Sequence, residues 1–83
     1  FTVILPQTER PGAAAVAERL RATVEQHAFP LAAPGAITVS AGISAFPHDG
    51  ETVVSLIEAA DRALYLAKGN GRNRVEGIEP LAA

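Results

Sequence analysis

The sequence contains no cysteine, no methionine and no tryptophan, and its aromatic residues are one tyrosine and three phenylalanines. Without cysteine the chain has no disulfides, no thiolate metal sites and no cysteine nucleophile. No apolar run approaches the roughly 18 residues of a membrane-spanning helix, and the apolar opening segment lacks the basic flank and the length of a signal peptide. Because residue 1 is not methionine, we expect the sequence to be a fragment of a longer chain.

Neither sign of charge dominates, because 7 lysines and arginines stand against 9 aspartates and glutamates in 83 residues. This balance provides no basic surface for a polyanion, so we expect no nucleic-acid partner and no membrane contact from this segment. A hydrophobic content of 48% is too high for a disordered tail. The length suits one small core, so we expect a single domain or part of one. The absence of cysteine is compatible with the cytoplasm, where we expect the protein to be located.

The first part of the chain predicts a strand followed by a helix. Phe1–Leu5 is apolar on both alternating sets of residues, which is typical of a strand buried on both faces, and Pro6 ends it. Residues 9–28 predict an amphipathic helix capped by Thr8, with apolar residues recurring every four positions. These are Val16, Leu20 and Val24. The polar residues of this helix are interpreted as a solvated face: Glu18, Arg19, Arg21, Glu25 and Gln26.

The second part predicts strand, helix and strand, which makes the order β-α-β-α-β. Residues 37–45 alternate between apolar and small polar side chains, the period of a strand. Gly42 within it permits close approach of another backbone or of a ligand, and a simple bulge explains it as well. Thr52 caps a predicted helix that runs to about Lys68, with an apolar stripe of Leu56, Ala60, Ala63, Leu64 and Ala67. Gly69 and Gly71 end this helix, and residues 72–75 predict a short last strand.

One group of residues on the second helix suggests binding chemistry. Asp61, Tyr65 and Lys68 have the spacing i, i+4, i+7, which places them along one helix face. Arg72 follows Lys68 by four residues, so an ammonium and a guanidinium can converge on one anion such as a polyphosphate. The alternative is structural, because cations in a last helical turn interact favourably with the helix dipole and glycine commonly ends helices.

No self-contained catalytic site is visible in the sequence. His27 and His48 lie far apart, and neither has a second ligand at metal-binding spacing. A P-loop, a strand followed by GxGxxG, and a Ser/His/Asp arrangement with supporting context are all lacking. We therefore assign no catalytic residue and no metal ligand to this chain.

Residues 59–75, from Ala59 to Val75, resemble the C-terminal signature of GGDEF domains, the diguanylate cyclase family. Ile37–Ser44 is similar to the strand that precedes this signature in the family, and Phe1–Pro6 is similar to the strand that begins at the final Phe of the GGDEF motif. The resemblance covers residues 1 to about 76, which would be the C-terminal half of the domain, with residues 77–83 as a tail.

The resemblance implies an α/β (α+β) fold, the β-α-β-α-β portion of a ferredoxin-like or palm-like cyclase domain with a mainly antiparallel sheet. It implies a parent domain that condenses two GTP into cyclic di-GMP for bacterial signalling, with Mg²⁺ or Mn²⁺ and one GTP on each subunit of a homodimer. The motif and the metal ligands would lie upstream, so we expect the fragment alone to be inactive. We also expect it to self-associate through its apolar first strand.

By position, Lys68 and Arg72 match the family's basic residues that contact the GTP phosphates. Arg19 matches the place where many members have an arginine that joins the product-inhibition site. Asp61 and Tyr65 belong to the signature and are interpreted as holding the helix in place, with Asp61 orienting a neighbouring basic residue. Two alternatives stay open: a degenerate GGDEF domain that binds GTP or a protein partner without making product, and a generic α/β domain in which Lys68 and Arg72 only cap a helix.

Overall fold

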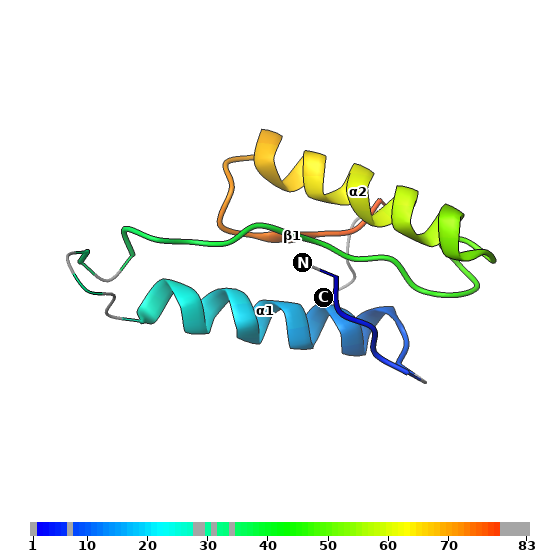
Figure 1. Cartoon of the computed structure of the whole chain (residues 1–83), viewed down its shortest axis with the longest axis horizontal. Coiled ribbons are helices and arrows are strands. Elements are labelled where there is room, and N and C mark those ends of the chain that lie inside the picture. Colours follow the sequence, from blue (N-terminus) through cyan, green and yellow to red (C-terminus); the bar gives the residue numbers. More distant parts are fainter. Residues whose placement is uncertain (1, 7, 28–29, 31, 34, 79–83) are drawn as a thin grey trace.

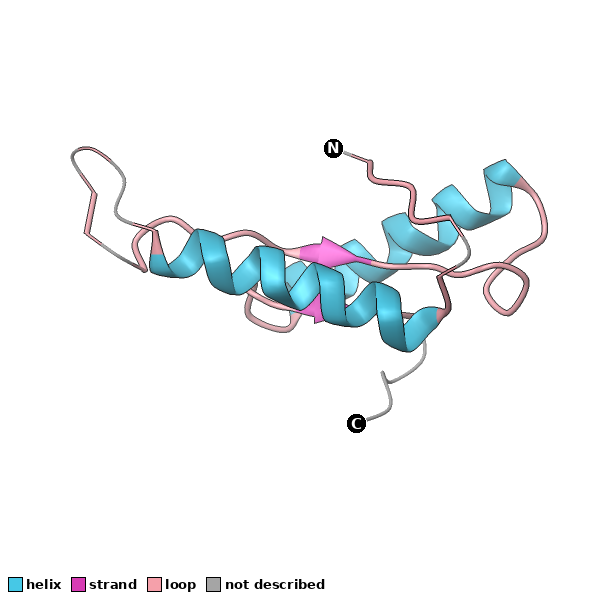
Figure 2. Ribbon diagram, turned by 90° about the horizontal axis from the view of Figure 1, so that it is seen from below, coloured by secondary structure: helices cyan, strands magenta, loops and turns pink. Residues whose placement is uncertain are grey.

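The computed structural model describes residues 2–6, 8–27, 30, 32–33 and 35–78. In this part of the chain the elements are α1 (Arg10–Gln26), β1 (Ala41–Gly42), α2 (Val53–Gly69) and β2 (Val75–Glu76). The two strands lie between the helices: α2 is above them and α1 below in Figure 1. Figure 2, seen from below, shows α1 in front of the strands and α2 behind them. The described segments thus form helix, strand and helix layers.

Helix α2 begins where the sequence predicts. The Thr52 hydroxyl accepts a hydrogen bond from the Ser55 backbone N–H, and the Ser55 hydroxyl accepts one from the Thr52 N–H, both at 3.0 Å. This reciprocal arrangement satisfies two backbone donors that a helix start leaves unpaired. The predicted cap is confirmed, so α2 starts at Val53 as predicted, and it ends at Gly69, one residue beyond the predicted end near Lys68.

Helix α2 lies close to β1 because the contacting residues are small. Ala59, Ala63 and Ala67 recur every four positions and have no exposed surface. At Gly42 of β1, a Cβ atom would lie 2.2 Å from the Ala60 carbonyl oxygen. The close backbone approach that the sequence permits at Gly42 is therefore made by α2. Much of the small core is therefore the contact between the buried alanines of α2 and the backbone of β1 at Gly42.

The sheet is parallel, so the prediction of a mainly antiparallel sheet is wrong for the described strands. Ala41 pairs with Val75, and Gly42 pairs with Glu76. The Ala41 N–H donates to the Arg74 carbonyl and the Ile43 N–H to the Glu76 carbonyl, both at 3.0 Å. A helix as long as α2 between two neighbouring strands returns the chain to the edge where it started, which makes the strands parallel.

The predicted strand at Phe1–Leu5 is not formed by residues 2–5, and Phe1 lies outside the described residues. Val3 is 66% exposed and Ile4 is 83% exposed, although both were expected to be buried. A strand is stabilised by pairing with a neighbour, and no described segment pairs with these residues. The predicted strand at 37–45 is reduced to Ala41–Gly42 for the same reason, because its partner β2 is only two residues long.

Helix α1 differs from the prediction mainly in its cap and its burial. Glu9 occupies the N-cap position without a side-chain cap, while the Thr8 hydroxyl donates to the Pro6 carbonyl at 3.0 Å. The helix ends at Gln26, before the predicted end at 28, which lies outside the described residues. Leu20 is 54% exposed, and no residue of α1 is buried.

Among the described residues, no helix is long and apolar enough to cross a membrane.

Candidate functional site

The chain turns sharply at the carboxyl end of α2. Asn70 is the C-cap, and Gly71 follows with a φ of +116°. The Arg72 N–H then donates to the Ala67 carbonyl at 2.9 Å. This six-to-one hydrogen bond after a glycine of positive φ is the Schellman arrangement of a helix end. Of the two glycines predicted to end the helix, Gly71 makes the turn and Gly69 is the last helical residue.

The two residues after Gly71 also have positive φ angles. Arg72 has a φ of 62° and Asn73 a φ of 47°, both in the left-handed region. This conformation costs roughly 1–2 kcal/mol for an ordinary residue, and asparagine tolerates it better than arginine does. The backbone at Arg72 is therefore held in an unfavourable conformation by its surroundings, a feature that clusters at functional sites.

Lys68 and Arg72 lie at this same end of α2. Lys68 is in the last helical turn, and the Arg72 N–H is bonded back to that turn. Both residues are exposed. Neither side chain forms an ion pair or hydrogen bond with the described residues. The carboxyl end of a helix carries partial negative charge that favours such cations, and two exposed cations together can also bind a polyanion.

The other predicted site residues lie apart from this helix end. Asp61 and Tyr65 are exposed on α2, Tyr65 by 78%, and they precede Lys68 along the helix as the spacing predicts. Arg19 is exposed on α1, the helix on the other side of the strands (Figure 1). The structure thus brings Lys68 and Arg72 to one end of α2 and leaves Arg19 on a different element.

A cluster that sequence reasoning missed joins α1 to the loop after α2. The Arg21 Nη1 atom donates to Asn73 Oδ1 at 2.8 Å, and Asn73 Nδ2 donates to Glu25 Oε2 at 2.5 Å. On its other side, Arg21 Nε donates to both Glu18 oxygens, at 2.6 and 2.9 Å. We call these four residues, Glu18, Arg21, Glu25 and Asn73, the α1–loop cluster. The Arg21 side chain is only 15% exposed, so its interpretation as part of a solvated face is wrong.

The carboxylates of the α1–loop cluster are stabilised in their charged form. The hydrogen bond from Arg21 lowers the pKa of Glu18. The hydrogen bond from Asn73, followed by that from Arg21, lowers the pKa of Glu25. The hydrogen bond to Glu18, followed by the interaction with Glu25, raises the pKa of Arg21. All three groups are therefore charged at neutral pH, and the negative Glu25 carboxylate fixes the donor direction of the Asn73 amide.

We expect the stabilisation from this cluster to disappear in acid. A carboxylate whose pKa is lowered by folding stabilises the folded state above its unfolded value, here near 4.5, and loses this effect as pH falls through the folded pKa. The thermal midpoints of the wild type and Glu25→Gln should therefore differ above about pH 5 and converge at lower pH. Glu58→Gln, at an exposed position on α2 outside the cluster, is the matched control. A difference that persists unchanged at pH 2 contradicts the ionic contribution.

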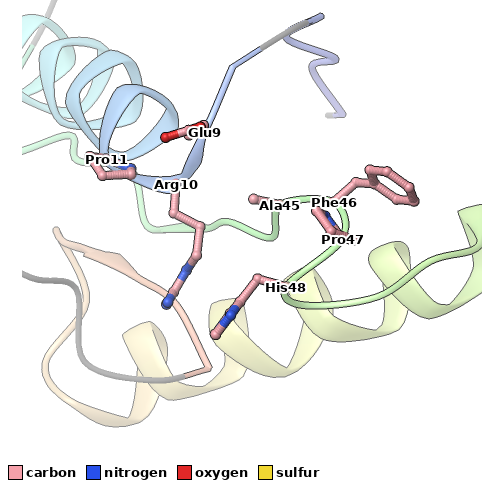
Figure 3. A pocket seen from close by; sticks show the side chains of 7 residues that line it. All are labelled: Glu9, Arg10, Pro11, Ala45, Phe46, Pro47 and His48. Carbon is pink, nitrogen blue, oxygen red and sulfur yellow. The ribbon is translucent and has the colours of Figure 1, made fainter.

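A shallow hollow of about 270 Å³ lies at the start of α1, next to the turn at residues 46–49. In Figure 3 the Arg10 and His48 side chains extend side by side, and Phe46 points away from them. Arg10 Nε lies 3.4 Å from Asp49 Oδ2, which also accepts a hydrogen bond from the Ala45 N–H at 2.8 Å. The Asp49 side chain is 4% exposed, and the hydrogen bond that it accepts from the Ala45 N–H stabilises the turn. These contacts give Arg10 a structural role at the edge of the hollow.

The described residues do not fit a divalent metal ion. Among them no three histidine, aspartate or glutamate side chains gather in one place, and the chain has no cysteine. A hard cation such as Mg²⁺ needs several oxygen ligands, usually including a carboxylate. We therefore derive no step of any reaction through a metal held by this part of the chain.

Comparison with known proteins defines the class to which this α/β chain belongs. The model of the diguanylate cyclase GGDEF domain matches residues 1–74. Diguanylate cyclase A of Treponema denticola is 43% identical over 76 residues, which cover 90% of this chain and 20% of that protein. The response regulator PleD of Caulobacter vibrioides is 39% identical over 80 residues, covering 93% of this chain and 18% of PleD. The chain belongs to the GGDEF family of diguanylate cyclases.

The chain covers only a small part of the relatives that it matches. Diguanylate cyclase DgcP of Pseudomonas aeruginosa is 43% identical over 77 residues, covering 92% of this chain and 11% of that protein. The chain thus spans a fifth or less of the length of these relatives. No solved structure gives a significant match. The resemblance inferred from the sequence is confirmed at the level of the family.

Proposed function

We propose that this chain is the C-terminal half of a GGDEF domain that condenses two GTP into cyclic di-GMP, and that Lys68 and Arg72 hold the GTP phosphates. The observation that carries the proposal is the pair of exposed cations at one helix end, of which Arg72 has a backbone held at positive φ. The match of the family model to residues 1–74 supports it. In this proposal residues 1–76 belong to the domain and residues 77–83 are a tail.

Lys68 and Arg72 act by charge in this proposal. The Lys68 ammonium is a compact donor, and the Arg72 guanidinium can place two parallel N–H groups on phosphate oxygens. Together they neutralise negative charge on the triphosphate and hold it in place, an electrostatic and positioning effect. Asp61 and Tyr65 hold α2, and Arg19 joins a product-inhibition site. Mg²⁺ or Mn²⁺, the acid-base groups and the second GTP come from outside this chain, in a cytoplasmic homodimer.

A product assay on the complete protein that carries this chain tests the proposal. The protein is incubated with GTP and Mg²⁺, and cyclic di-GMP is separated by chromatography. We expect cyclic di-GMP from the complete protein and none from the 83-residue chain alone. GTP binding by folded protein without any product would contradict the cyclase activity and favour the degenerate, nucleotide-binding alternative.

We further expect the isolated 83-residue chain to self-associate. Val3, Ile4 and Ile37 are 66%, 83% and 43% exposed, so a solitary chain leaves large apolar side chains in water. Light scattering should show a mass that increases with concentration, and Val3→Lys with Ile4→Lys should reduce it. Arg62→Lys, which keeps an exposed charge on α2, is the control. A single monomeric species at high concentration contradicts this expectation.

A further inference from the structure

We propose that Asn73 is a positioning residue: held between Arg21 and Glu25 of α1, it fixes the backbone of Arg72 for binding the phosphates of the nucleotide. The inference rests on the proposed function, because it concerns how one of the two phosphate-binding cations is held. It adds three residues, Asn73, Arg21 and Glu25, that do not touch the ligand themselves. It is carried by the geometry of the loop between α2 and β2.

Asn73 is the only residue of this loop whose side chain bonds to another helix among the described residues. Its Oδ1 atom accepts from Arg21 at 2.8 Å and its Nδ2 atom donates to Glu25 at 2.5 Å, so both ends of the amide are used. Its backbone N–H donates to the Ser40 hydroxyl at 3.1 Å, just before β1. An aspartate would lose the donor and place a negative charge against Glu25, so the site requires an amide.

The α1–loop cluster gives the amide a rigid support. Arg21 is itself oriented by Glu18, one turn earlier on α1, through both carboxylate oxygens. A bidentate arginine–carboxylate contact restricts the guanidinium more than a single hydrogen bond does. The Arg21 side chain therefore has few conformations available, and its hydrogen bond holds Asn73 in a fixed position relative to α1.

The backbone of Arg72 is anchored at its own N–H and at the residue that follows it. Its own N–H is bonded to the Ala67 carbonyl of α2 at 2.9 Å, and Asn73 follows it directly. With bonds to α2 on one side and to α1 and Ser40 on the other, the positive φ of 62° at Arg72 is retained. The φ angle sets the direction of the Cα–Cβ bond, so the cluster determines the direction in which the Arg72 side chain leaves the backbone. A cation already in place loses less entropy when a phosphate binds.

The test is Asn73→Gly in the complete protein. Glycine adopts a positive φ without cost, so this change removes the side-chain contacts without straining the backbone. If the competent loop conformation falls to about a third or a tenth of the population, the KM for GTP rises about 3- to 10-fold. We expect kcat to change less than KM, and we expect faster amide hydrogen exchange at Arg72. Asn70→Ala, which removes one exposed contact to Glu76, is the control and should change neither.

The outcomes separate this inference from the proposed function. An unchanged KM in Asn73→Gly overturns the positioning role, even if amide exchange at Arg72 becomes faster. A raised KM in Asn73→Gly, with Arg72→Ala having no effect on KM, also overturns it, because the cluster would then act through another group. If Lys68→Ala and Arg72→Ala both leave kcat/KM unchanged, the phosphate assignment itself fails. Glu25→Gln, which keeps an acceptor for Asn73, is a milder second variant if Asn73→Gly does not fold.

Discussion

Replacing Gly42 with alanine should destabilise the fold by about 3 kcal/mol. The added Cβ atom would lie 2.2 Å from the Ala60 carbonyl oxygen and 2.3 Å from the Leu64 nitrogen. Both are backbone atoms of α2, so no side chain can rotate away and the helix must move from β1. An intact domain of this size has a total stability of roughly 4–12 kcal/mol and a half-domain has less, so a substantial part would be lost. Urea unfolding followed by circular dichroism measures the change.

Gly69→Ala is the matched control for this prediction. Gly69 is the last residue of α2, and a Cβ atom added there meets no atom within 4 Å. Alanine in a helix is favoured over glycine by roughly 0.5–1 kcal/mol, so this variant should be as stable as the wild type or slightly more stable. If Gly42→Ala unfolds at the same urea concentration as the wild type, the close packing of α2 on β1 is not present in the protein.

Replacing Lys68 or Arg72 with alanine should reduce kcat/KM for GTP about 10- to 150-fold, since a charge-assisted contact contributes roughly 1.5–3 kcal/mol. Both cations are exposed at one end of α2, away from the core, so their removal should leave the thermal midpoint nearly unchanged. Steady-state kinetics of cyclic di-GMP formation by the complete protein measures the effect. Loss of activity together with unfolding would not support the assignment.

Two further variants make this prediction specific. Arg62→Ala removes another exposed cation of α2 and should leave kcat/KM within about twofold, because it lies almost two turns before Lys68. Arg72→Lys keeps the charge and loses the planar fork, so its kcat/KM should fall between those of the wild type and Arg72→Ala. Equal effects from Arg62→Ala and Lys68→Ala would indicate a general loss of positive charge and would contradict a defined phosphate site.

Helix α2 could be predicted from the sequence because its determinants are local. The Thr52 cap and the Gly71 turn lie within a few residues of the bonds that they make. The strands depend on partners that are distant in the sequence, and the local pattern of residues does not show which segments pair. The strand predicted at Phe1–Leu5 has the right residues, yet Ile4 is 83% exposed because nothing described pairs with it. The parallel direction of the strands follows from the path of the chain through α2. The resemblance implied a mainly antiparallel sheet and so did not predict it.

In the candidate site, too, the local features could be predicted from the sequence and the contacts between distant residues could not. Lys68 and Arg72 were found because they stand four residues apart at a helix end within a recognisable signature. The α1–loop cluster was missed because Arg21 and Asn73 are 52 residues apart. A local signal was present, since Glu18 and Glu25 flank Arg21 at i−3 and i+4, the spacing of ion pairs on one helix face. That spacing alone is typical of solvated helices, and only the fold shows that Asn73 completes it.

Equilibrium binding tests the phosphate assignment most directly. The complete protein, as wild type and as the Lys68→Ala/Arg72→Ala double variant, is titrated calorimetrically with 3′-deoxy-GTP, which cannot form the 3′–5′ linkage, and with 3′-deoxyguanosine. We predict that the double variant loses affinity for the triphosphate by at least about tenfold and retains its affinity for the nucleoside. The same preference for the triphosphate in both proteins would contradict the role of Lys68 and Arg72 as the phosphate-binding residues.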